Sequence, residues 1–394
     1  MTMNPGDDEA IPGVFGDLMK VLGAQNSTSM WLDSARTLAL GVASDHAPEG
    51  TPDPVVRIAL EGLIDLVALQ VSAVSDGELS NGQAPGLTVM SRSQFASSTL
   101  DQWTPRVATL VSAQTSTPFS GDALDGAVPK ELEAFMGQML QAMGPVLVGL
   151  QVGSACGHLA KEAFGPHDVP LPSGASDSIL LVGPNVQQFA IDWSIEPSAA
   201  QILALAREII ATRLFSTPHI AARLEELLSA ALVESAASQG NFLEQLQSSD
   251  EGVDLEAMLS NPEAILERLS TPSQRWVSTQ LSSLVAALEA TVDRFTIAVA
   301  ERMLGTGSPA IEAFRRARTS YGSGVEAACS LFGIDSSQQQ AERGNRFVDG
   351  VLERGSLEQL LDLVRRTDGL PTPAEVDAPG LWIERLSLAT DNER

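Results

Sequence analysis

The histidines are the first residues to consider for metal or acid–base chemistry, and their spacing predicts no metal site. The chain has four of them, His46, His158, His167 and His219, and no two lie three or four residues apart on one helix. Two imidazoles need that spacing to converge on one ion from a helix face. Cys156 and His158 are two residues apart, so a helix points their side chains in different directions. We therefore expect a structural role for each histidine.

The motifs of nucleophilic and phosphate chemistry are also missing. No Gly-x-Ser-x-Gly occurs, and Ser154, within Gly153–Gly157, lies in a helical pattern and not on a strand-to-helix turn. Residues 322–324 lack the third glycine and the preceding strand of a nucleotide-binding loop. Paired carboxylates such as Glu225 and Glu226 are typical of a solvated face in so acidic a chain. No catalytic class follows from these motifs.

One predicted helix carries two charged residues inside an otherwise apolar run. Apolar residues recur at helical spacing over residues 202–215, and Arg207 and Glu208 interrupt the run. A charge inside a buried helix must be paired, because an unpaired buried charge is costly. We therefore predict that the Arg207 guanidinium contacts at least one carboxylate in the core.

Most elements that position these residues are expected to be helices. Strand signals are few: Ser178–Gly183 is the best candidate, and Val89–Ser93 is a second. Three or four short strands are the most that we expect, so the predicted fold class is mainly α with a minor β contribution and a small sheet. Helical spacing predicts helices over residues 30–44, 53–73, 95–111, 129–161, 186–193 and 202–215, and over most of the last third of the chain.

A row of small residues marks one of these helices. Gly149, Gly153 and Gly157 lie four residues apart, which brings them to one face and lets another backbone come close. We expect tight helix packing there, and a binding cleft is the alternative. The same helix is uncharged between Glu133 and Lys161, but its polar residues argue against a membrane span, and we expect none.

The net charge indicates which classes of binding partner to expect, and the cysteine content indicates the cellular compartment. Acidic residues number 50 against 24 basic ones, which gives a net charge of −26. A field of this sign repels phosphate backbones and anionic lipids, so we expect neither nucleic acid nor a membrane surface as the partner.

Two cysteines cannot form a disulfide framework, and the first residues lack the basic start of a secretory signal. We therefore expect a cytoplasmic location, and the sequence indicates no oligomeric state.

Four stretches of the chain resemble one known family. Residues 149–155 and 179–186 are similar to its glycine-rich helix and to the strand and Pro-Asn turn that follow, and residues 339–351 and 370–379 resemble its closing motifs. The family is that of the actinobacterial zincin-like hydrolases, described as zinc-dependent metalloproteases, some of them associated with deazaflavin-cofactor biosynthesis. The resemblance implies a zincin-like helical core with a small sheet, flanked by helical lobes. It divides the chain into a flexible leader over 1–30, an N-terminal helical lobe over 31–128, the zincin-like core over 129–237 and a C-terminal helical lobe over 238–394.

The buried charged helix falls where that family carries His-Glu-x-x-His followed by a phenylalanine. By this resemblance Arg207 stands at the first histidine, Glu208 at the glutamate, Ala211 at the second histidine and Phe215 at the aromatic position. In a zincin the imidazoles hold Zn²⁺, and the glutamate takes a proton from the metal-bound water. Arginine stays protonated and alanine has no ligand atom, so both helical ligands are absent. The resemblance therefore implies a degenerate motif with Glu208 as a vestigial general base and no cofactor.

Three functions remain open for such a chain. We favour a non-catalytic scaffold that has lost its zinc ligands and binds a protein or peptide in the degenerate cleft. An active zinc hydrolase would have to draw ligands from elsewhere, for example from His219 with Glu225 or Glu226. A small-molecule or deazaflavin-linked binding protein would use the glycine-rich cleft.

Overall fold

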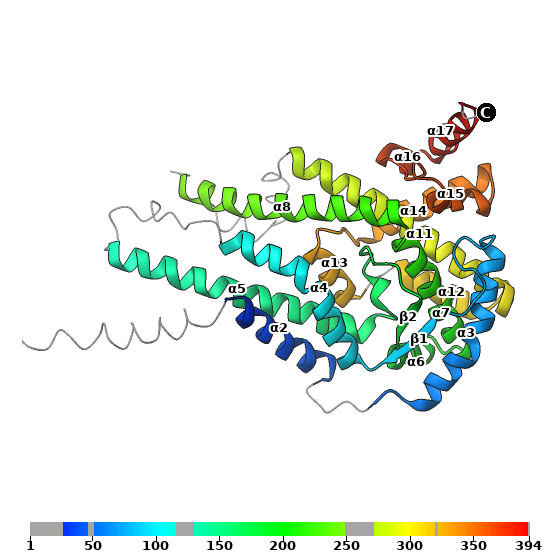
Figure 1. Ribbon diagram of the computed structural model, residues 1–394, viewed down its shortest axis with the longest axis horizontal. Coiled ribbons are helices and arrows are strands. Elements are labelled where there is room, and N and C mark those ends of the chain that lie inside the picture. The colour runs from blue at the N-terminus through cyan, green and yellow to red at the C-terminus, as the bar shows by residue number, and fades with distance from the viewer. Residues whose placement is uncertain (1–26, 46–50, 116–129, 249–271, 320–321, 393–394) are drawn as a thin grey trace, which may run out of the picture.

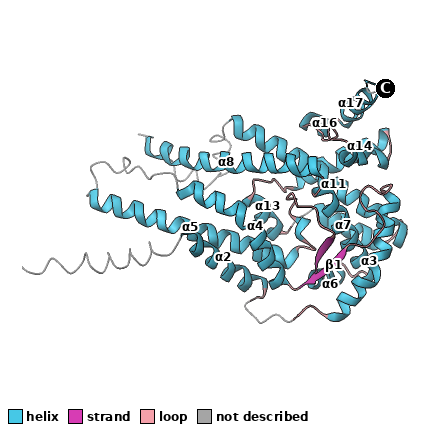
Figure 2. Cartoon of the chain, viewed as in Figure 1, coloured by secondary structure: helices cyan, strands magenta, loops and turns pink. Residues whose placement is uncertain are grey.

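The structure is a computed structural model that describes residues 27–45, 51–115, 130–248, 272–319 and 322–392. Helices dominate these residues, and two strands form a small sheet among them (Figures 1 and 2). The predicted fold class, mainly α with a minor β part, is confirmed. The described residues contain two strands, which is compatible with the expected maximum of three or four. The predicted leader, apart from residues 27–30, lies outside the described residues.

Long helices lie side by side along one half of the molecule. Helices α2 (Ser27–Ala43), α4 (Arg92–Thr115) and α5 (Lys130–Glu162) pack on one another, and α8 (Pro218–Ser248) lies along α4 (Figure 1). Helix α5 continues through Pro145. A proline inside a helix removes one backbone hydrogen bond, so the packing of α5 must offset that loss. Among the described helices, none has the length and apolarity needed to cross a membrane.

The glycine row of α5 is the contact surface for α2. A Cβ atom added at Gly149 would meet the backbone of Trp31, and one at Gly153 would lie 2.5 Å from the carbonyl oxygen of Ala35. Gly157 would likewise meet Val42. Only glycine lets the two helices approach this closely, because any side chain would force them apart. Helix α2 therefore occupies the face that the sequence analysis left open as a cleft.

The small sheet leads directly into the central helices. Strand β1 (Gly86–Met90) pairs in parallel with β2 (Ser178–Val182), from Gly86 opposite Ser178 to Met90 opposite Val182. Strand β2 lies where it was predicted. Strand β1 lies earlier in the chain than predicted. It ends at Met90 because α4 already starts at Arg92. Helix α6 (Gly183–Asp192) follows β2 at once, since Pro184 suits the first turn of a helix.

Helix α7 (Pro197–Phe215) is buried along almost its whole length. From Ala199 to Phe215 every residue except Arg213 is buried. The helix packs against α3 (Pro54–Val74), α6 and α11 (Pro272–Leu304). Any polar side chain on it must therefore find its partners inside the protein.

The C-terminal part packs against α11. Helix α11 begins at Pro272 and ends at Leu304, and a short turn separates it from α12, which begins at Pro309. Helix α8 runs across residues 237 and 238, where the sequence analysis placed a lobe boundary. The remaining elements are α12 (Pro309–Thr319), α13 (Ser323–Leu331), α14 (Gln338–Arg354), η3 (Leu357–Leu361), α15 (Asp362–Arg365), α16 (Pro373–Asp377) and α17 (Pro379–Asn392).

Candidate functional site

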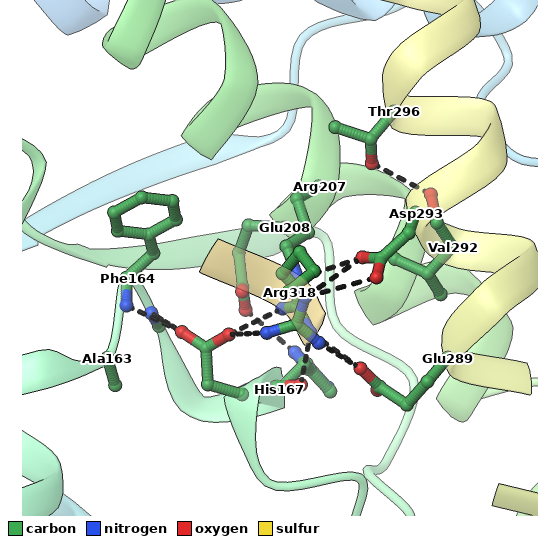
Figure 3. A network of polar contacts seen from close by, with 12 residues as sticks. Ala163, Phe164, His167, Arg207, Glu208, Glu289, Val292, Asp293, Thr296 and Arg318 are labelled. Carbon is green, nitrogen blue, oxygen red and sulfur yellow. Dashed lines mark hydrogen bonds and ion pairs between the residues drawn. The ribbon is translucent and has the colours of Figure 1, made fainter. Parts of the chain in front are cut away.

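A cluster of buried charges surrounds the guanidinium of Arg207 on α7 (Figure 3). Its Nη1 lies 3.1 Å from Oδ1 of Asp168, and its Nη2 donates to Oε2 of Glu289 at 2.9 Å. Its Nε lies 3.7 Å from Oδ1 of Asp293. Asp168 belongs to the short helix η2 (Pro166–Asp168), whereas Glu289 and Asp293 are one turn apart on α11. The prediction that Arg207 contacts a carboxylate in the core is confirmed.

A second guanidinium, that of Arg318 on α12, reaches the same three carboxylates. Its Nη1 lies 3.2 Å from Oδ1 of Asp168, its Nε lies 3.1 Å from Oδ2 of Asp293, and its Nη2 contacts Oε2 of Glu289. Two cations thus share three anions, all of them shielded from solvent. Such a cluster is stable only while every member keeps a partner of opposite charge.

Burial and the two guanidinium groups act against each other on the pKa values of Asp168 and Glu289, and the outcome differs between them. Burial alone would raise the pKa of Asp168, but Arg207, Arg318 and the backbone N–H groups of Phe164 and Gly165 outweigh it and hold this pKa below 3.8. Burial raises the pKa of Glu289 above 4.5 despite both guanidinium groups. The direction for Glu289 fits its contacts, because its Oε1 has no hydrogen-bond partner among the described residues.

Glu208, next to Arg207, faces a histidine. Its Oε1 lies 2.7 Å from Nδ1 of His167, and only 1% of Glu208 is exposed. The other ring nitrogen of His167, Nε2, lies 3.1 Å from Oγ of Ser173. The imidazole stacks on the ring of Phe215 with 5.7 Å between centroids. A Cβ added at Gly165 would lie 2.5 Å from Oε2 of Glu208, so a glycine is needed at this position for the carboxylate to fit.

The residues considered as alternative zinc ligands have other partners. His219 Nε2 lies 2.8 Å from the carbonyl oxygen of Leu363. Arg106 donates to Glu225 at 2.6 Å, and Arg223 donates to Glu226 at 2.7 Å. Within the described residues none of these three side chains contacts Glu208. Ala211 is fully buried in α7 and offers no ligand atom.

The donor set around α7 does not fit zinc. In the described ranges no three His, Cys, Asp or Glu side chains are arranged to hold a metal ion. Carboxylate oxygens do gather at Arg207, but they are already paired with the guanidinium groups of Arg207 and Arg318. A zinc ion placed there would meet two fixed positive charges instead of imidazole nitrogens.

A pocket of about 580 Å³ lies against the C-terminal half of α7. Thr212 is 7% exposed, and its Oγ1 has no hydrogen-bond partner among the described residues. Other helical threonines, such as Thr291 and Thr296, donate to the carbonyl oxygen four residues earlier. The hydroxyl of Thr212 is therefore a buried donor without a partner among the described residues. The pocket is lined by Ile209, Thr212 and Arg213 of α7, by Ser216 directly after the helix, and by residues from the segments 77–85 and 175–179.

Sequence reasoning missed most members of the site. Glu289 and Asp293 are charged residues four apart in an otherwise apolar helical run, which is the same signal that singled out Arg207. That signal could have been read for α11 as well. His167 and Ser173 lie in an irregular stretch around proline residues, where no periodicity reports on burial.

Comparisons with known proteins agree with this architecture. The family model described as a zincin-like metallopeptidase matches residues 32–383. A crystal structure from Chloroflexus aurantiacus, described as that of a "putative hydrolase with a novel fold", is similar with a TM-score of 0.59 and 18% sequence identity. The match covers 90% of this chain and 98% of the other, and at this identity it shows a common fold alone. No curated protein matches the chain.

Proposed function

Since the chain belongs to the zincin-like metallopeptidase family, we propose that it is a member that works without zinc and binds a peptide or protein through the region around α7. The observation that carries this proposal is the position of Arg207. Its guanidinium lies among three carboxylates from two elements, as a bound cation would. By the resemblance to the family motif, the same residue stands at the first histidine position.

The surroundings of Glu208 support the loss of metallopeptidase chemistry. A zincin glutamate acts on water bound to the metal. Here His167 holds one oxygen of Glu208, and the neighbouring position 211 is alanine. Glu208 is therefore a carboxylate without a metal-bound water to act on, which corresponds to the vestigial general base of a degenerate motif.

The pocket beside α7 supports binding as the remaining role. It has both apolar lining, from Ile179 and Ile209, and polar lining from Thr212, Asp177 and Arg213. A concave surface with a few well-placed polar groups is the usual form of a binding site. The deazaflavin-linked alternative loses its support, because α2 fills the glycine row on which it depended. A cytoplasmic location stays a prediction from the cysteine content and the first residues of the chain, and the exclusion of nucleic acid stays a prediction from the net charge.

Metal analysis of the purified full chain tests this proposal. After dialysis against zinc and then against zinc-free buffer, we expect far less than one zinc ion per chain and no chelator-sensitive peptidase activity. A zincin with its ligands intact retains its metal under these conditions. Stoichiometric zinc in the dialysed protein would refute the zinc-free proposal and support the active hydrolase.

A further inference from the structure

We propose that Ser173, His167 and Glu208 form a metal-free acyl-transfer triad next to the α7 pocket, with an ester or another activated acyl group as its substrate. Serine, imidazole and carboxylate follow one another at hydrogen-bond distance, 3.1 Å and 2.7 Å. This is the order of groups in serine hydrolases, which is recognised by geometry on unrelated folds and not by sequence position. The proposed function assigns zinc-free binding to the region around α7, and this inference goes beyond it by adding a covalent reaction beside that region.

The proposed triad requires one tautomer of His167, and the contacts are compatible with it. In the triad Glu208 is the hydrogen-bond acceptor, so Nδ1–H of His167 donates to its Oε1. The imidazole Nε2 then carries a lone pair and accepts the hydroxyl hydrogen of Ser173. The nucleophile and its base are therefore connected in the direction that proton abstraction requires.

Packing holds the base and the carboxylate in place. His167 is 6% exposed and lies flat on Phe215. Nη2 of Arg207 donates to the carbonyl oxygen of His167 at 3.2 Å, which ties the imidazole's backbone to the charge cluster. The backbone N–H of Ser173 donates to the carbonyl oxygen of Phe215 at 3.3 Å, so the serine is anchored to the end of α7. A preorganised constellation of this kind loses little entropy in the reaction.

The serine lies beside an accessible site. Ser173 is half-buried, and the next residues, 174–177, are exposed. A Cβ atom added at Gly174 would meet nothing within 4 Å, so space is open directly after the nucleophile. Residues 175–177, which follow Ser173 closely in the chain, line the pocket. Ser216, which follows the hydrogen-bond partner Phe215, lines it as well. The free hydroxyl of Thr212 in the same pocket is a donor for a substrate oxygen.

The reaction balances without a metal or a second reagent. Ser173 Oγ attacks the acyl carbon while Nε2 of His167 takes the hydroxyl proton, and Glu208 stabilises the imidazolium that forms. The bond from the acyl carbon to the leaving oxygen breaks, and that oxygen receives the proton from Nε2. Water then attacks the acyl-serine by the same route, giving the carboxylic acid and free Ser173.

Covalent labelling of the full chain with a fluorophosphonate in the presence of EDTA tests the triad. Ser173 Oγ forms a bond to phosphorus and fluoride leaves, which gives a stable adduct that peptide mapping by mass spectrometry locates. We expect one adduct per chain on Ser173, none in Ser173→Ala, and a labelling rate lower by roughly 10²-fold or more in His167→Gln. Ser387→Ala, an exposed serine on α17, is the matched control and should label as the wild type does.

The variant Glu208→Gln distinguishes a role of Glu208 in positioning His167 from a role in folding. The amide cannot hold His167 in the same tautomer, so the labelling rate should fall by at least about 10²-fold while the circular dichroism spectrum stays that of the wild type. If Glu208→Gln unfolds, the labelling of Ser173→Ala tests the triad without it, because this variant removes only one half-buried hydroxyl. Absence of an adduct in the wild type, or an adduct that persists in Ser173→Ala, overturns the triad. Because EDTA is present, zinc found in the metal analysis would refute the proposed function without changing this result.

Discussion

Replacing Arg207 by methionine should lower the free energy of unfolding by about 3–5 kcal/mol, the usual cost of removing one partner of a buried ion pair. Methionine keeps a similar length and apolar stem but leaves Asp168, Glu289 and Asp293 with Arg318 as their remaining guanidinium partner. Arg207 is 1% exposed, so water cannot replace the lost charge. Urea denaturation followed by circular dichroism measures the difference.

Arg316→Met is the matched control for this variant. Arg316 lies on α12 and pairs with Glu312 at 2.7 Å, but both side chains are exposed. Exposed pairs contribute about 0–1 kcal/mol. If Arg207→Met costs no more than Arg316→Met, the charge cluster does not depend on Arg207 and the account of its position is wrong.

Acid should reduce the defect of Arg207→Met. Arg207 lowers the pKa of both Asp168 and Glu289, so its removal raises both values in the folded state. A carboxyl group whose folded pKa lies above its unfolded value contributes stability that is lost as the pH rises through the folded pKa. The difference between wild type and variant should therefore be largest near pH 7–8 and smaller near pH 4–5, and a defect that grows on acidification would contradict this assignment.

The double variant Arg207→His, Ala211→His should gain zinc binding that the wild type lacks. The two imidazoles would stand four residues apart on α7, which is the spacing of a helical zinc pair. Removing Arg207 also releases one of the two guanidinium contacts of Glu289, whose Oε2 lies 2.9 Å from the present Nη2. We expect about one zinc ion per chain and a thermal midpoint that rises with zinc concentration, because zinc binds the folded state.

The single variant Arg207→His is the control for the double one. It offers one helical imidazole and should bind zinc much more weakly. Zinc content after dialysis and the shift of the thermal midpoint measure both variants together. A double variant that takes up no zinc would show that the groups around α7 no longer surround a metal position.

The sequence predicts the helices well because they bury long apolar faces. Strand β2 was also predicted, since a run of apolar residues before Pro184 is a strong local signal. Strand β1 was placed three residues late, because its partly exposed residues alternate weakly and the start of α4 overlaps the predicted range. Element ends depend on local competition that a hydrophobic pattern does not report.

The site was predicted in part, through Arg207 and Glu208. Their burial follows from the apolar helix around them, and so does the need for carboxylate partners. Which carboxylates those are depends on how η2, α11 and α12 approach α7, and no local pattern encodes this. His167 was expected to be structural, yet tertiary packing places its ring between Glu208 and Ser173. Side chains from an irregular segment become a constellation only after the fold has brought them together.

The position of Arg207 is tested most directly by a crystal structure of the wild-type chain grown with zinc, with diffraction data collected on both sides of the zinc absorption edge. We expect guanidinium density between Asp168 and Glu289 and no anomalous peak near α7. An anomalous peak within coordinating distance of Glu208 would show that the site still holds a metal, and the zinc-free account of this family member would be wrong.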